Sequence, residues 1–222
     1  MEVKPIGTIY TPFKQKLGIP RQPLLCPSVK GRIVFTPEFA REDTLRSLES
    51  FSHVWLIYWC HKSDSWRETI KPPRLGGKEK VGFLATRSPH RPNPLGLSLA
   101  KLEKINDDFS IEISGLDILD ETPLIDLKPY LPMWDSVPEA NNGWVDKTPE
   151  LEKLSVDFSL VERELEKLSA QDKTALEETL CWDPRPAYTK DENRTFIHCV
   201  GALEVTWKKE NQTIKVVAIK KA

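Results

Sequence analysis

The first 135 residues consist of short apolar segments separated by proline or glycine, and this pattern constrains the fold more than any other feature of the chain. Segments of this length that are rich in β-branched and aromatic residues are typical of strands, and strands at this spacing favour a barrel or a sandwich. One longer segment, residues 37–51, has apolar residues at helical spacing and predicts a helix. The predicted strands are residues 6–13, 30–35, 53–60, 80–86, 95–105, 109–119 and 123–131.

A polar, turn-rich stretch at residues 134–150 separates this part from a C-terminal part of different composition. We therefore predict two domains, residues 1–145 and a small α+β domain at residues 146–222. In the second domain we expect a helix that begins after the cap residue Ser169. The predicted elements there are a strand leading into a helix (154–168), a helix (169–180) and a hairpin (195–209 and 213–221).

Composition indicates where the chain works. Its longest apolar run, residues 54–60, is far shorter than the ~20 residues that span a bilayer, and the N-terminus lacks the apolar segment of a signal peptide. The four cysteines form no CxxC pair, which is typical of free thiols in a reducing compartment. We therefore expect a cytoplasmic protein that does not contact a membrane.

The formal net charge is −1, which excludes a globally basic protein that coats nucleic acid. A polyanionic partner would have to bind a local patch. Taken alone, the richest basic run is either a phosphate-binding surface or an ordinary solvated surface. Its basic residues are Arg67, Lys71, Arg74, Lys78 and Lys80.

Residues 85–96, ATRSPHRPNPLG, place three prolines, two arginines, a histidine and an asparagine in twelve positions. Each proline fixes its own φ and pushes the preceding residue towards an extended conformation. The segment is therefore a stiff polar loop between two apolar segments, and it carries more functional side chains than a turn requires. It is the first candidate for a site.

Common catalytic motifs are absent from the sequence. No GxSxG, HExxH, GxxxxGK[ST] or GxGxxG pattern occurs, which argues against hydrolases, zinc proteases, nucleotide triphosphatases and doubly wound cofactor domains. Histidines and cysteines do not recur at the short spacings of a zinc site, so we predict no metal. The adjacent pair Cys60 and His61 is better explained by a core thiol beside a loop histidine.

Polar or proline-fixed segments cluster where the predicted strands end. Together they supply fixed backbone groups, cations for carboxylates or phosphates, and apolar walls for a flat ring. Any one of them alone is a weak signal, because prolines and arginines often only shape loops. These segments are residues 19–23, 60–63, 71–77, 86–98, 114–123 and 126–130.

At these segments the chain resembles the tRNA N6-methyladenosine methyltransferases that act beside the anticodon on threonylcarbamoyl-adenosine. The similarity covers nearly the whole chain. It implies an S-adenosylmethionine-dependent homodimer with sites near the subunit interface. It also implies a mainly β fold, in which a β-barrel methyltransferase domain that binds S-adenosylmethionine (residues 1–145) precedes the small α+β domain. The similar segments are IGTIYTPFK, IPRQP, FSHVWLIY, PPRLGG, ATRSPHRPNPLGLS, LDILDETPLIDLKPYLP and DPRPAY.

The resemblance also implies which residues form the site. Leu24 and Lys62 differ from the glycine and glutamine of bacterial relatives, so backbone contacts are expected there. The implied cofactor-binding residues are Gln22, Pro23, Leu24, His61, Lys62, Arg87, Leu97, Ser114, Gly115, Leu116 and Asp117. The candidate substrate-binding residues are Arg91, Asn93, Lys128, Arg67 and Arg74.

Methyl transfer from a sulfonium is an in-line displacement that depends mainly on orientation of the reactants. The acceptor nitrogen also has to lose a proton, and Asp117, Asp126 or a backbone carbonyl could receive it. Tyr130 is a further catalytic candidate, and Asp126 is equally well explained by an ion pair with Lys128 or an arginine.

Two other classes of protein stay open at this point. A small barrel with basic loops could be a non-catalytic RNA-binding module. Exposed tryptophans at Trp66, Trp134 or Trp144 could instead anchor a protein-interaction adaptor, although each could also pack in a core.

Overall fold

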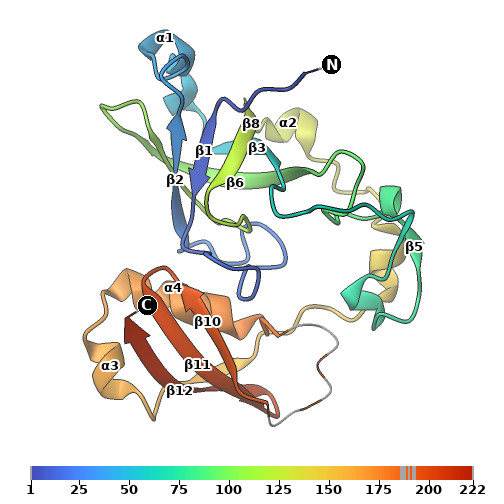
Figure 1. Cartoon of the computed structure of the whole chain (residues 1–222), viewed down its shortest axis with the longest axis vertical. Helices are drawn as coiled ribbons and strands as arrows, with labels where there is room; N and C mark the ends of the chain where they lie inside the picture. Colours follow the sequence, from blue (N-terminus) through green and yellow to red (C-terminus); the bar gives the residue numbers. More distant parts are fainter. Residues whose placement is uncertain (1, 186–188, 190, 192–193, 222) are drawn as a thin grey trace.

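The computed structural model describes residues 2–185, 189, 191 and 194–221, which form two β-rich parts joined by an extended linker (Figure 1). Within the described residues, six strands close into an antiparallel barrel in the order β1-β2-β7-β6-β3-β8. The mainly β fold with a barrel is therefore confirmed. The barrel strands are β1 (Gly7–Tyr10), β2 (Lys30–Phe35), β3 (His53–Trp59), β6 (Leu95–Ile105), β7 (Ile111–Ser114) and β8 (Thr122–Pro129).

The barrel interior is filled by alternate residues of its strands. Successive side chains of a strand point to opposite faces, so one apolar residue in two faces inward. Ile9, Ile33, Leu56 and Leu124 are fully buried in this way and belong to one apolar cluster. The period-two pattern of the sequence therefore becomes a single closed core.

Two predicted elements of this part are wrong. Residues 37–51 form only the short helix α1 (Glu42–Leu45) and the 3-10 turn η1 (Leu48–Ser50), because Ser47 between them adopts a left-handed backbone with φ 68°. Residues 80–86 form only the two-residue strand β5 (Val81–Gly82), and a 3-10 turn, η3 (Phe83–Ala85), follows it directly.

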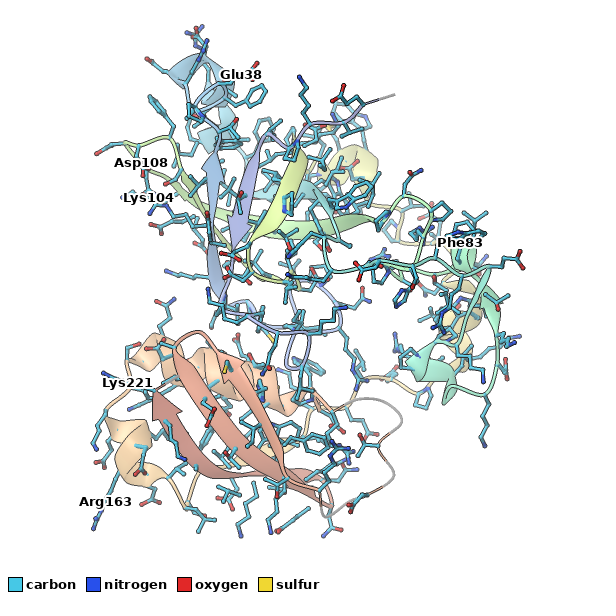
Figure 2. All side chains as sticks on the ribbon, viewed as in Figure 1. Glu38, Phe83, Lys104, Asp108, Arg163 and Lys221 are labelled. Carbon is cyan, nitrogen blue, oxygen red and sulfur yellow. The ribbon has the colours of Figure 1, made fainter. Side chains whose placement is uncertain are left out.

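Residues 60–94, here called the arm, lie between β3 and β6 and extend away from the barrel (Figure 1). They contain β4 (Thr69–Ile70), the 3-10 turn η2 (Pro73–Leu75), β5 and η3. The Cys60 N–H donates to the carbonyl of Pro94 at 2.7 Å and closes the base of the arm. Figure 2 labels Phe83 near β5 in this arm.

Arg91 braces the arm from within. Its Nη1 donates to the carbonyls of Phe83 and Thr86 at 3.0 and 2.7 Å, and its guanidinium lies 5.3 Å from the centre of the Phe83 ring. A guanidinium offers several donors in a fixed plane and also stacks on aromatic faces, so one side chain can join both ends of a loop. The proline-rich loop therefore owes part of its shape to an arginine.

The C-terminal part is a four-stranded sheet in the order β10-β11-β12-β9 with two helices (Figure 1). The strand leading into a helix and the capped helix are confirmed, and the Ser169 hydroxyl accepts the Asp172 N–H at 3.1 Å. The predicted hairpin is only partly right, because residues 195–209 form two strands with a turn at Gly201, whose φ is 61°, between them. Residues 186–188 of the DPRPAY segment lie outside the described residues. The elements are β9 (Ser155–Asp157), α3 (Glu162–Glu166), α4 (Ala170–Cys181), β10 (Phe196–Val200), β11 (Leu203–Glu210) and β12 (Thr213–Lys221).

The linker between the two parts carries the short helix α2 (Pro132–Asp135) and the 3-10 turn η4 (Gly143–Lys147). All four cysteines of the chain are described, and each is a free thiol. Among the described residues, no helix combines the length and the apolar character needed to span a bilayer.

His198 makes the C-terminal core sensitive to pH. Its side chain is fully buried, its Nδ1 accepts the Trp207 indole N–H at 2.8 Å, and burial lowers its pKa from 6.5 to about 4. Between pH 4 and pH 6.5, His198 is therefore neutral in the folded chain but protonated in the unfolded chain. Stability from this group is complete above pH 6.5 and falls as the pH drops towards 4.

We expect the free energy of unfolding to fall by on the order of 3 kcal/mol between these pH values because of His198 alone. Denaturant unfolding of the wild type and His198→Gln at pH 7 and pH 4.5 measures this contribution. The variant should show a flatter pH dependence, and parallel pH dependences in the two proteins would contradict the assignment.

Candidate functional site

A pocket of about 880 Å³ opens where the barrel, the arm and the segment between β1 and β2 meet. Its size lies within the ~300–1,000 Å³ range of small-molecule sites. Residues 11–29, here called the β1–β2 segment, form one wall through residues 19–23. The arm forms the opposite wall through residues 61–63 and 86–91, and the ends of β3 and β6 form the base.

The turn after β7 brings an acidic side chain into this pocket. Gly115 takes a left-handed backbone with φ 77°, which is strained for a residue with a side chain, and a Cβ there would lie 2.6 Å from Leu24 Cδ2, so glycine is favoured. The Leu24 N–H donates to the Gly115 carbonyl at 2.9 Å, and the Gly115 N–H donates to the Val29 carbonyl at 3.0 Å. This turn, held by the β1–β2 segment, places Asp117 in the pocket lining.

Asp117 ends a chain of hydrogen bonds. The Ser98 hydroxyl donates to Asp117 Oδ1 at 2.5 Å, and the Tyr58 hydroxyl lies 3.1 Å from Ser98 Oγ. Burial raises the pKa of Asp117 to about 6, although the bond from Ser98 and the charge of Arg87 act in the opposite direction. A carboxylate with such a pKa can hold or release a proton close to neutral pH.

Two polar contacts join the walls across the pocket. Arg87 Nη1 of the arm donates to Gln22 Oε1 at 3.4 Å, and Lys16 Nζ donates to the Lys62 carbonyl at 2.9 Å. On the barrel side, His61 Nδ1 lies 3.4 Å from Thr122 Oγ1. Burial and the charge of Lys62 lower the pKa of His61, which favours a neutral imidazole. The pocket therefore combines cations, one carboxylate and a neutral ring.

The structure gathers most of the predicted cofactor-binding residues in this pocket. Ser114 and Leu116 are instead buried behind it, while Gly115 and Leu24 form the supporting contact described above. The predicted cofactor-binding residues that line the pocket are Gln22, Pro23, His61, Lys62, Arg87, Leu97 and Asp117.

Only some of the predicted substrate-binding residues line the pocket. Arg74 and Arg91 line the pocket, but the Arg91 guanidinium is already bound to carbonyls of the arm. Arg67, Asn93 and Lys128 do not line it.

Of the three catalytic candidates, only Asp117 lines the pocket. Asp126 pairs with Lys128 at 3.0 Å, the arrangement that its position in the sequence had left open. Tyr130 packs edge to face on Trp55, with ring centres 5.6 Å apart. Asp117 is thus the acidic group that this geometry offers to a ligand.

The three tryptophans considered as anchors differ in their surroundings. Trp66 and Trp134 are 52% and 70% exposed. Trp144 lines the pocket and donates its indole N–H to the Ala85 carbonyl at 2.8 Å, which ties the linker to the arm. Within the described residues, no group of three His, Cys, Asp or Glu side chains could hold a metal ion.

Sequence reasoning missed Tyr58 and Ser98. Tyr58 is paired with Gly96 across β3 and β6, and a Cβ on Gly96 would lie 2.2 Å from the Tyr58 ring. A lone hydroxyl in the apolar segment LGLSLA and a glycine beside it were the available signals. Their meaning depends on the pairing of β3 with β6, which only the fold provides.

Comparison with known proteins identifies the family. Residues 8–136 match the family model described as the tRNA-methyltransferase O N-terminal domain, and residues 151–222 match the TrmO C-terminal domain. This chain belongs to the tRNA-methyltransferase O family.

Similar proteins match over almost their full length. An Escherichia coli (strain K12) protein named tRNA (adenine(37)-N6)-methyltransferase is 37% identical, covering 96% of this chain and 95% of that protein. A Pseudomonas aeruginosa protein named putative S-adenosylmethionine-dependent methyltransferase RcsF is 39% identical, covering 92% and 91%. The crystal structure of TrmO from P. aeruginosa matches with a TM-score of 0.82 at 31% identity, covering 100% and 97%.

The pocket fits the cofactor named in that second relative. S-adenosylmethionine carries a carboxylate, ribose hydroxyls, a flat adenine ring and a cationic sulfonium. The pocket offers cations at Arg87 and Lys16, a carboxylate at Asp117, and apolar contacts at Pro23 and Leu97. The carboxylate, the sulfonium and the adenine ring of the cofactor therefore each have a complementary partner in the lining.

Because burial raises the pKa of Asp117 to about 6, its ionised carboxylate destabilises the folded state at neutral pH. The pKa is higher in the folded chain, so stability is lost as pH rises from about 4 to about 6. We expect Asp117→Asn to increase the free energy of unfolding by about 2–3 kcal/mol at pH 8 and to have little effect at pH 3.5.

Denaturant unfolding at the two pH values measures this difference. Asp126→Asn is the control, because its exposed pair with Lys128 should contribute less than about 1 kcal/mol. Equal destabilisation by Asp117→Asn at both pH values would show that the carboxylate carries no burial cost.

Proposed function

We propose that this chain is an S-adenosylmethionine-dependent methyltransferase that methylates N6 of an adenine next to the tRNA anticodon, with threonylcarbamoyl-adenosine as the acceptor. The observation that carries the proposal is the pocket, which brings together Gln22, His61, Arg87 and Asp117. The full-length similarity to the E. coli protein named tRNA (adenine(37)-N6)-methyltransferase supports the same reaction and acceptor atom. The threonylcarbamoyl group on the acceptor is inferred from the family resemblance of the sequence motifs.

When bound, S-adenosylmethionine supplies a methyl group on a sulfonium, which is already a good leaving group. The protein has to orient the reactants and exclude water. The walls at residues 19–23 and 86–91 enclose the space in which an adenine can lie beside the donor. We assign to Asp117, whose pKa burial raises to about 6, the role of accepting the proton that the acceptor nitrogen loses.

The arm supplies the positive charge for RNA. Lys62 and Arg74 line the pocket in addition to Arg87, while the chain as a whole has a net charge of −1. A local group of cations of this kind binds phosphates or a substrate carboxylate without making the whole surface basic. We therefore assign tRNA binding to the arm side of the pocket.

We further propose that the enzyme works as a homodimer in the cytoplasm. The family resemblance of the sequence motifs supports the homodimer, and Leu84, Leu97, Met133 and Trp134 are large apolar side chains that are 79%, 55%, 76% and 70% exposed. Leu97 also lines the pocket, so a second copy seated there would lie close to the site. The cytoplasmic location follows from the tRNA substrate and the free thiols.

The proposed function predicts the modified nucleosides of cells that lack this protein. Mass spectrometry of their digested tRNA should show threonylcarbamoyl-adenosine without its N6-methyl group. The wild-type gene should restore the methylated form. Arg87→Ala should restore less than about a tenth of it, because a charged partner of the ligand is lost.

Arg46→Ala is the matched control, since Arg46 pairs with Asp43 on α1 and does not line the pocket. Unchanged nucleosides in the deletion strain, together with tRNA binding by the purified protein, would favour the non-catalytic RNA-binding barrel. Unchanged nucleosides without tRNA binding would favour the adaptor.

A further inference from the structure

The β1–β2 segment has two sides. Residues 19–23 line the pocket, and the segment also packs on the C-terminal domain (Figure 1). We propose that the C-terminal domain positions this pocket wall through Glu178 and Trp182, and so sets the affinity of the pocket for S-adenosylmethionine. The inference rests on the proposed function for the identity of the ligand.

Glu178 of α4 holds the β1–β2 segment at Ser28, five residues beyond the wall. Its carboxylate accepts the Ser28 N–H at 2.8 Å and the Ser28 hydroxyl at 3.0 Å, one bond on each oxygen. Its backbone carbonyl accepts the Cys26 thiol at 3.3 Å. Hydrogen bonds to an ionised partner are the stronger kind, and a pair of them also fixes orientation. A residue outside the pocket therefore fixes the position of Ser28.

Trp182, directly after α4, makes the next contact. Its indole N–H donates to the Leu25 carbonyl at 2.9 Å. Its ring and Ala175 pack against a cluster in which Phe13, Cys26 and Val29 are at most 1% exposed. These three apolar residues of the β1–β2 segment are thus packed against the C-terminal domain.

The start of the segment is held as well, because the Gly201 N–H donates to the Pro12 carbonyl at 2.8 Å. Within the wall itself, Arg21 Nη2 donates to the Asp183 carbonyl at 3.0 Å. Gly18, with φ 92°, lies so close to His198 that an added Cβ would be 2.3 Å from its ring. Contacts with the C-terminal domain therefore lie on both sides of residues 19–23 and, through Arg21, within them.

The residue after the wall, Leu24, also contacts the turn that carries Asp117. Leu24 takes a left-handed backbone with φ 63°, which is strained for leucine, and its N–H binds the Gly115 carbonyl two residues before Asp117. If Leu25 and Ser28 shift, the Leu24 contact shifts with them. The C-terminal domain thus acts on the turn that carries Asp117 without touching the ligand.

The test compares the full-length wild type with Glu178→Ala. We expect Glu178→Ala to weaken S-adenosylmethionine binding roughly tenfold in calorimetry, because both bonds to Ser28 are lost. Glu178→Gln should restore the affinity to within about twofold, because an amide can accept the Ser28 N–H and donate to its hydroxyl. Glu177→Ala, an exposed change on the same helix, should bind like the wild type.

Hydrogen exchange without ligand provides a second readout. Amides of residues 16–28 should exchange faster in Glu178→Ala than in the wild type or Glu177→Ala. Trp182→Phe, which keeps a ring but loses the bond to Leu25, should also weaken binding and serves if Glu178→Ala does not fold.

The outcomes separate the two proposals. The inference would be overturned if Glu178→Ala kept the affinity and the exchange rates of the wild type. The same holds for Trp182→Phe where that variant is used. It would also be overturned if Glu178→Gln bound S-adenosylmethionine as weakly as Glu178→Ala. A wild type that binds no S-adenosylmethionine would contradict the proposed function. The exchange rates would then decide alone whether the C-terminal domain positions the wall.

Discussion

The pairing of β1 with β8 closes the barrel, and the site depends on this closure. It sets Gly7 opposite Leu124 and brings the turn before β8 against the chain that leaves β1. There the Thr11 N–H donates to Asp120 Oδ1 at 2.8 Å, and the Thr11 hydroxyl donates to the Ile118 carbonyl at 2.8 Å. Asp120 is 7% exposed and also pairs with Lys14. Because this turn is fixed from both sides, Asp117 has a defined place in the pocket.

The remaining parts of the site are arranged around that turn. The barrel contributes Tyr58 and Ser98, which support the Asp117 carboxylate, and the arm contributes cations on a loop stiffened by proline. Enzymes often keep a buried charge at some cost in stability when the charge is needed for chemistry. The raised pKa of Asp117 is such a cost. The arrangement suits a reaction in which orientation and one proton acceptor are the main requirements of the protein.

Sequence reasoning predicted a strand at each of the six barrel strands because alternate burial leaves a clear period-two pattern. It predicted too long a helix at residues 37–51, since nothing in the pattern marks the left-handed backbone of Ser47. Arg91 resembled a ligand contact, yet its partners are carbonyls that only the folded arm brings together. The support from Glu178 was also invisible, because Glu178 and Ser28 are 150 positions apart in the chain. Motifs thus located the pocket, whereas folding determined which residues line it and which hold it in place.

The most direct test of the central claim, that this pocket holds the methyl donor, is a crystal structure of the protein with S-adenosylhomocysteine, the demethylated product of that donor. The account predicts ligand density between the two walls, in contact with Gln22, His61 and Asp117. Density in the second cavity, about 340 Å³ between Ser28 and the start of α4, with none between the walls, would contradict it.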